Sequence, residues 1–156
     1  MIATPPIEIP SAIRAAVYAH AREAYPSECC GYLTGPRDGA AVDGAVICDN
    51  AQASGDHPAA PERTARDGFV ISGRQLFDFA NSFSGPNPAR IVYHSHPNGR
   101  AYLSVVDRAV AAPDGPAYPV QHLVVGLTSE AITEVAQFAW SDDDHDYIEI
   151  ARWSLR

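Results

Sequence analysis

Residues 90–107 have the sequence RIVYHSHPNGRAYLSVVD, in which the pattern of a buried strand is followed directly by the pattern of a helix start. The apolar run RIVYHSH predicts a buried strand, which Pro97 ends. Ser104 is a favoured N-cap residue, and Asp107 follows it by three positions. This spacing predicts the first turn of a helix over residues 103–112.

The same stretch carries three potential metal ligands. His94 and His96 are two positions apart on the predicted strand, so both imidazoles point to one side while Ser95 points away. Asp107, in the first helical turn, can turn back toward them. Two imidazole nitrogens and one carboxylate oxygen would leave the fourth position of a zinc ion to water, as in catalytic zinc sites. A structural explanation is also open, since Ser104 and Asp107 are accounted for as a capping box.

Helix and strand patterns alternate along the rest of the chain. Their order, α-β-β-loop-α-β-α-β-β-β, predicts an α/β (α+β) domain with a single mixed β-sheet flanked by helices, spanning residues 1–156. Residues 49–68 predict a long surface loop within it, which we expect to contact substrate. The other predicted elements are a helix over 11–26 that Ser11 caps and Pro26 stops, strands over 28–35 and 40–48 with a bulge at Gly44, a short strand over 69–72, a helix over 73–83 that Ser72 and Gln75 cap, and strands over 118–127, 131–140 and 147–153.

The composition argues against several classes of partner. The 156 residues suffice for one domain with a hydrophobic core. The net charge is −8, and no cluster of basic residues is present to neutralise phosphates, which argues against a nucleic-acid partner. No apolar run approaches the ~20 residues that span a bilayer, and no signal-peptide pattern is present. We therefore expect a cytoplasmic protein without a membrane partner.

The three cysteines, Cys29, Cys30 and Cys48, do not predict a disulfide framework, because their number is odd and two are adjacent. A nucleophilic thiol would need a nearby histidine, and the metal explanation already uses both histidines of the strand. We expect small buried side chains, with Cys30 on the face of Glu28 and Cys29 on the other.

Other polar groups have plainer explanations. The run SDDDHD over residues 141–146 lacks the glycine and closing glutamate of a calcium loop, so it predicts a solvated turn. His122 lies in an apolar strand and is expected to be a hydrogen-bonded core or edge residue. His20, His57 and His145 have no partner at ligand spacing. The signatures of the zinc deaminases are absent.

Taken together, these residues resemble the motif of the JAMM (MPN+) metalloproteases. His94, His96 and Asp107 match its H-x-H-x(10)-D pattern, Ser104 matches its serine, and Glu28 in PSECCGYLTG matches its upstream glutamate. The resemblance covers nearly the whole chain and is strongest to the short, stand-alone bacterial and archaeal members. It implies the JAMM/MPN fold, which is similar to that of cytidine deaminases.

The resemblance also implies a mechanism. The family binds one Zn²⁺ per chain, here through His94, His96 and Asp107, and the metal activates water for amide hydrolysis. Glu28 would act as general base and then acid, and Ser104 would donate a hydrogen bond to the oxyanion.

Substrates of the family are ubiquitin-like proteins with a Gly-Gly tail. Only 49 residues follow Asp107, which leaves little room for the added loops of members that cut polyubiquitin. A ubiquitin-like sulfur-carrier protein is therefore the expected partner, either as a precursor or as a carrier that releases an amino acid. Two alternatives remain open: a non-catalytic zinc-stabilised MPN binding module, and a hydrolase of small peptides or amides.

Overall fold

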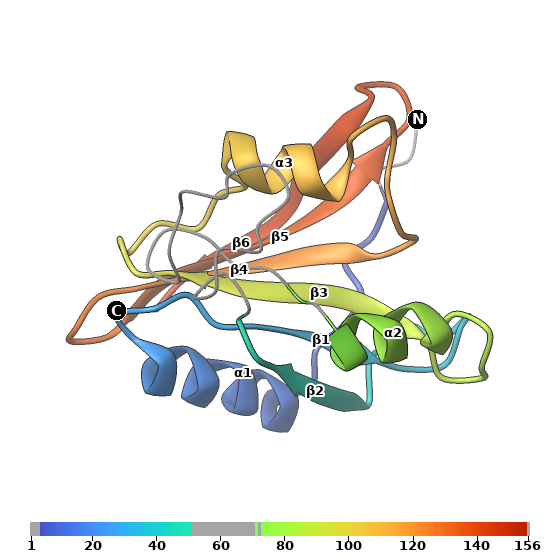
Figure 1. Cartoon of the computed structure of the whole chain (residues 1–156). Helices are drawn as coiled ribbons and strands as arrows, with labels where there is room; N and C mark the ends of the chain where they lie inside the picture. Colours follow the sequence, from blue (N-terminus) through green and yellow to red (C-terminus); the bar gives the residue numbers. More distant parts are fainter. Residues whose placement is uncertain (1–3, 51–70, 72, 156) are drawn as a thin grey trace.

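The computed structural model describes residues 4–50, 71 and 73–155, and it shows a six-stranded mixed sheet with helices on both faces (Figure 1). The strand order is β2-β1-β3-β4-β5-β6, in which β3 and β4 run parallel and the other neighbouring pairs are antiparallel. This confirms the predicted α+β architecture and the predicted order of elements. The elements are α1 (Ser11–Ala24), β1 (Cys30–Thr34), β2 (Gly44–Cys48), α2 (Gly73–Ser82), β3 (Ala89–His96), α3 (Val105–Ala111), β4 (Gln121–Leu127), β5 (Ile132–Ser141) and β6 (Asp146–Ser154).

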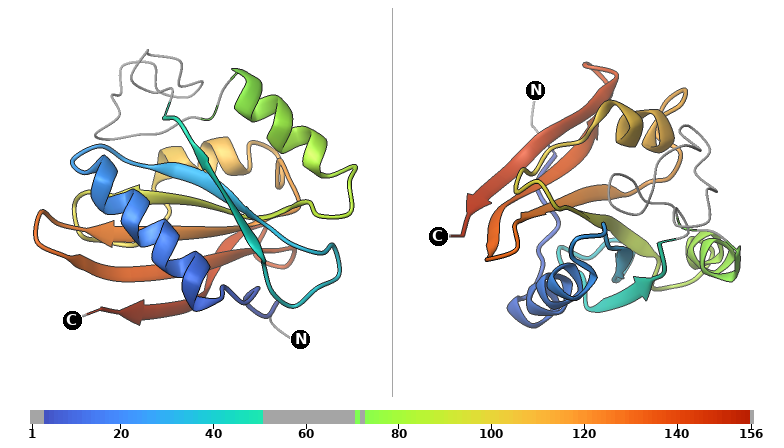
Figure 2. Two further views of the ribbon diagram at one scale, coloured as in Figure 1. Left: turned by 90° about the horizontal axis from the view of Figure 1, so that it is seen from below. Right: turned by 60° about the vertical axis from the view of Figure 1, so that its left-hand side comes forward.

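Different helices pack on the two faces of the sheet (Figures 1 and 2). On one face, α1 packs through Val17 and Ala21 on a core that includes Tyr93 and Leu123. On the other face, α2 packs through Phe79 over β1 and β3, and a separate cluster lies next to α3 over β4 and β5. Strands β3 and β4 lie between these layers, which explains why their sequences are almost continuously apolar.

Two local predictions were wrong. Helix α1 has Pro10 as its N-cap, without a side-chain cap, and Ser11 is its first residue. The fixed φ of proline suits a helix start, so the helix begins one residue earlier than the serine indicated. Gly44 is not a bulge, because it pairs in register with Thr34. A Cβ at Gly44 would lie 2.8 Å from the Thr34 hydroxyl oxygen, so a larger residue there would require the Thr34 side chain to shift.

Part of the chain cannot be compared with its predictions. Residues 51–68 of the predicted surface loop, most of the predicted strand over 69–72 and the Ser72 cap lie outside the described residues. The single-domain assignment to residues 1–156 therefore stays a prediction. No described helix combines the length and the apolar character that crossing a membrane requires.

Candidate metal centre

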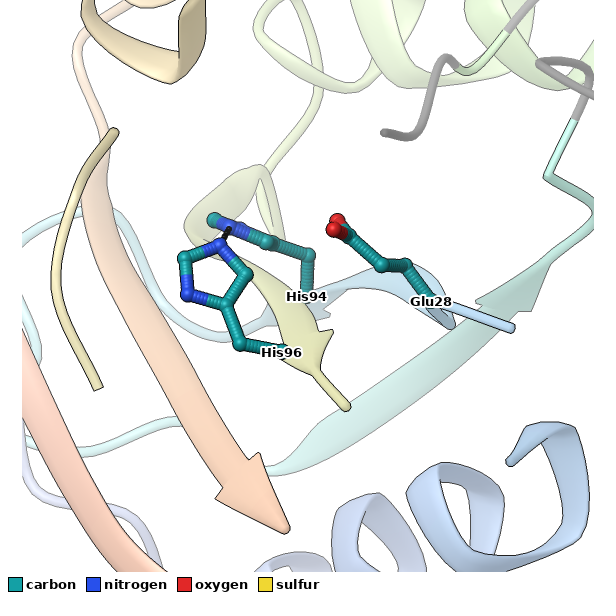
Figure 3. Close-up of side chains that lie close together, drawn as sticks. All are labelled: Glu28, His94 and His96. Atoms are coloured by element: carbon teal, nitrogen blue, oxygen red, sulfur yellow. Dashed lines mark hydrogen bonds between the residues drawn. The ribbon is translucent and has the colours of Figure 1, made fainter. Parts of the chain in front are cut away.

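Three side-chain atoms from two elements converge at the end of β3. The Nε2 atoms of His94 and His96 lie 3.1 Å apart. Oδ2 of Asp107, which comes from α3, lies 3.1 Å from the first nitrogen and 3.2 Å from the second. The two imidazoles share one face of the sheet, as their i and i+2 positions predict (Figure 3).

The spacing of these atoms fits one bound metal ion. Zinc–nitrogen and zinc–oxygen bonds of about 2.0–2.2 Å in a tetrahedral site place ligand atoms roughly 3.3–3.5 Å apart. The three observed separations of 3.1–3.2 Å are close to this value. The donor set of two imidazoles and one carboxylate is also one that zinc uses in catalytic sites. These residues therefore could hold a zinc ion with one position open.

A backbone carbonyl fixes the ring of His96. Its Nδ1 lies 3.2 Å from the carbonyl oxygen of Arg100, and the carbonyl can only accept. Nδ1–H therefore donates, and the lone pair of the neutral ring lies on Nε2, toward Asp107 and His94. The Tyr102 ring packs against the imidazole at a centroid distance of 4.7 Å, which further restricts its rotation.

Asp107 is positioned by the capping box at the start of α3. The backbone N–H of Ser104 donates to Asp107 Oδ2 at 2.9 Å, and the backbone N–H of Asp107 donates to Ser104 Oγ at 3.0 Å. The predicted capping box is thus confirmed, and it coexists with the metal-site geometry. Ser104 Oγ accepts in this bond, so its hydroxyl proton can donate to another group.

Glu28 lies beside the two histidines. One ligand atom each from Glu28, His94 and His96 lie within 4.8 Å of one another, and Glu28 is buried at 6% exposure. Figure 3 shows its carboxylate extending to the same side as the imidazoles. Glu28 therefore lies beside the two histidines that Asp107 also approaches.

The position of Glu28 depends on a contact that the sequence did not reveal. Cys30 pairs with His94 in the β1–β3 register. Just before this pair, the Cys29 N–H donates to Ser95 Oγ at 2.8 Å, and the Ser95 N–H donates to the Cys29 carbonyl at 3.1 Å. Ser95, predicted only to point away from the histidines, therefore anchors the segment that carries Glu28.

Burial and charge act in opposite directions on the converging groups. Burial would raise the pKa of Asp107, but the histidines outweigh it and hold that pKa well below its usual value. Burial would lower the pKa of His94, but the Asp107 carboxylate outweighs it and the pKa is raised. Burial lowers the pKa of His96. The carboxylate is therefore ionised, as metal binding requires.

The cysteines are buried, as predicted. Cys29 belongs to the core under α1, whereas Cys30 and Cys48 belong to the cluster under α2, so Cys29 and Cys30 face opposite sides. Burial raises the pKa of Cys29 and of Cys48 to about 11 and that of Cys30 further. Such thiols stay protonated near neutral pH and are poor nucleophiles.

The acidic run over 141–146 forms a local turn rather than a site. The Trp140 indole N–H donates to Asp142 Oδ1 at 2.9 Å, and the Ser141 hydroxyl donates to Asp144 Oδ2 at 2.8 Å. These contacts fix the turn between β5 and β6.

Comparisons with known proteins bear on the family and the fold of the chain. The model of prokaryotic homologs of the JAB domain matches residues 10–142. A solution structure of a protein from Desulfitobacterium hafniense is similar, with a TM-score of 0.63 and 23% identity over 90% of this chain and 87% of that one. A protein from Salinibacter ruber has a TM-score of 0.58 and 23% identity over 91% and 87% of the two chains. These structures support the fold alone.

A JAB1/MPN domain protein from Archaeoglobus fulgidus is more distant, with a TM-score of 0.48 and 14% identity over 92% of this chain and 95% of that one. No curated protein matches the chain. The family match spans most of the sequence, including the strand with the two histidines and the helix with Asp107. The chain therefore belongs to the family of prokaryotic homologs of the JAB domain.

Proposed function

We propose that this chain is a zinc-dependent metallopeptidase that hydrolyses the peptide or isopeptide bond after the Gly-Gly tail of a ubiquitin-like protein. The observation that carries the proposal is the convergence of His94 Nε2, His96 Nε2 and Asp107 Oδ2 within 3.2 Å, with buried Glu28 beside them. A purely structural zinc site closes its fourth position with a protein ligand, most often cysteine. The cysteines here lie in apolar core clusters instead.

In the proposed reaction, His94, His96 and Asp107 would hold one zinc ion, which when bound would polarise the scissile carbonyl and acidify water. Glu28 would take a proton from the attacking water and pass it to the leaving amine. The Ser104 hydroxyl would donate a hydrogen bond to the oxyanion, while its oxygen continues to accept from the Asp107 N–H.

The proposed partner is a ubiquitin-like sulfur carrier in the cytoplasm. Support comes from the resemblance of His94, His96, Asp107, Ser104 and Glu28 to the motif of a family whose members act on Gly-Gly tails. A Gly-Gly tail is extended and unobstructed by side chains, so it can approach a metal that lies at the end of a sheet strand.

The decisive experiment separates catalysis from metal binding. Glu28→Gln keeps the size of the side chain but removes the base. We expect a folded variant that binds one zinc ion per chain and has lost at least about a hundredfold in kcat/KM on a carrier fusion. Asp107→Ala is the control that should lose the metal as well. Full activity of the zinc-loaded Glu28→Gln protein would instead favour the binding-module alternative.

A second comparison tests the partner. A free Gly-Gly-X peptide and the same tail on a ubiquitin-like carrier are compared under single-turnover conditions. Faster cleavage of the fusion supports carrier recognition. Equal kcat/KM on both substrates would support a hydrolase of small peptides.

A further inference from the structure

An apolar pocket lies beside the proposed metal centre, on the face of the sheet that α2 and α3 cover. It has a volume of about 120 Å³, and His94 and Asp107 are among its lining residues. An apolar protein cavity of ~150 Å³ can bind benzene. The pocket therefore has room for one medium-sized side chain next to the metal ligands.

Residues of the strands and of the two helices line this pocket. Val92 and His122 are register partners across β3 and β4. Val92 is two residues before His94, so this pair lies about 7 Å along the strand from the metal ligand and on the same face. Apart from Asp107, the lining residues that the structure describes carry no acidic or basic side chain except histidine. The walls include Leu76 and Phe79 from α2 and Val110 and Ala111 from α3.

His122 is the unexplained polar group of the pocket. It is buried, with 8% of its surface exposed, and its ring contacts the Tyr147 ring edge-on at a centroid distance of 4.7 Å. The sequence predicts a hydrogen-bonded core or edge histidine, but no hydrogen bond joins its ring to any described residue. Burial is the main cause that lowers the pKa of His122 to about 3, and the nearby His94 adds to it. The ring is therefore neutral. A neutral imidazole offers one donor and one acceptor.

We infer that this pocket binds the side chain of the residue released from the substrate, and that His122 hydrogen-bonds to the tip of that side chain. The inference rests on the proposed function: both residues before the scissile bond are glycine there, so the adjacent side chain belongs to the residue after it. The pocket walls are apolar, and Asp107, the one charged residue among the described lining residues, is assigned to the metal. A charged side chain would therefore lose its hydration without gaining a charged partner, so the pocket favours an uncharged side chain. The preferred class is a neutral residue with an apolar stem and a hydrogen-bonding tip, such as glutamine.

Cleavage kinetics test this selectivity. Carrier fusions ending in Gly-Gly-X are prepared with X as Gln, Leu, Gly, Lys or Glu. We expect kcat/KM for Gln and Leu to exceed that for Gly, Lys and Glu by about tenfold or more. His122→Phe removes the hydrogen-bonding ring, so kcat/KM for Gln should fall relative to that for Leu, while Leu stays ahead of Lys. In Ala111→Phe, which fills the pocket, the ratio of Leu to Gly should fall toward one. Ala19→Phe, on exposed α1 surface, is the matched control and should keep the wild-type ratios.

A binding measurement separates this inference from the proposed function. N-acetyl-glutaminamide, N-acetyl-leucinamide and N-acetyl-glycinamide are titrated into the zinc-loaded protein, and the ring ¹⁵N shifts of His122 are followed by NMR. We expect saturable shifts with the first two probes, abolished in Ala111→Phe, and none with the glycine probe. Binding without cleavage of any fusion would refute the proposed function and leave the pocket assignment standing. Cleavage without probe binding, or without preference among X, would overturn the inference. Thermal unfolding of each variant identifies any loss of fold.

Discussion

Ser104 and Asp107 are joined by two hydrogen bonds, and the Oδ2 atom that accepts one of them also faces both metal-site histidines. The Ser104 N–H lies 2.9 Å from this oxygen, and the two Nε2 atoms lie 3.1 and 3.2 Å from it. A carboxylate oxygen has lone pairs for both kinds of partner. The capping box at the start of α3 therefore also orients the Asp107 carboxylate toward His94 and His96.

This double role makes Ser104 testable. Ser104→Gly should cost only a few tenths of a kcal/mol in stability, because glycine is tolerated at the N-cap. It removes the hydroxyl, so we expect kcat to fall by roughly 10²–10³ with zinc still bound. Ser104→Thr keeps the hydroxyl and is the control. The measurements are kcat, zinc content and thermal unfolding. Equal activity of the glycine and threonine variants would exclude an oxyanion role.

Ser95 should act through Glu28. Ser95→Ala leaves the buried Cys29 N–H without its acceptor, which should lower the free energy of unfolding by about 1–3 kcal/mol. Since this bond holds the segment that carries Glu28, kcat should fall as much as ~10²-fold while zinc affinity is retained. Ser154→Ala changes an exposed serine of β6 and should alter neither quantity. Loss of stability with unchanged kcat would show that the contact is structural only.

The local part of the site was predictable from the sequence. The strand, its two same-face histidines and the helix start at Ser104 follow from spacing within residues 90–107, where periodicity and capping rules apply. The capping box formed as predicted. The order of strands and helices was also predictable, because each pattern is local and the turns are marked by glycine and proline.

Contacts between distant segments were not predictable in this way. Cys29 and Ser95 are 66 residues apart, and their hydrogen bond depends on the register of β1 against β3. The placement of His122 beside Val92 depends on the parallel pairing of β3 and β4. Spacing alone placed Glu28 at the start of a strand, and only the resemblance to a family connected it with the histidines.

The thiols should be inert in the folded protein. With pKa values of about 11 for Cys29 and Cys48, roughly one thiol in a thousand is ionised at pH 8. Iodoacetamide should therefore neither label the native protein nor inhibit its proposed activity, whereas all three cysteines should react in denaturant. Mass spectrometry counts the adducts. Rapid native labelling with loss of activity would instead implicate a cysteine in the reaction.

Arg108 should hold α3 in place. Its guanidinium donates to Asp146 Oδ1 at 2.7 Å, to the Tyr147 carbonyl at 2.9 Å and to the Leu103 carbonyl at 3.2 Å. Arg108→Met removes all three bonds, so we expect a loss of about 1–2 kcal/mol in unfolding free energy and weaker zinc binding. Asp146→Asn removes only a partly exposed ion pair and should cost about 0–1 kcal/mol. Equal effects of both variants would contradict an anchoring role for the carbonyl contacts.

Metal removal should lower stability in a pH-dependent way. Zinc at about a thousandfold excess over its Kd adds ~4 kcal/mol, or roughly 10 °C in Tm for a chain of this length. The proton and the metal compete for His94, and Asp107 raises the pKa of this histidine against the effect of burial. The proton is therefore held to higher pH than on an ordinary histidine, and the zinc-induced rise in Tm should shrink as the pH falls from about 8 to about 6. Differential scanning calorimetry with and without a chelator measures this rise, with Asp107→Ala as the variant that should show little of it. A rise that is independent of pH, or equally large in Asp107→Ala, would mean that zinc stabilises the chain at another site.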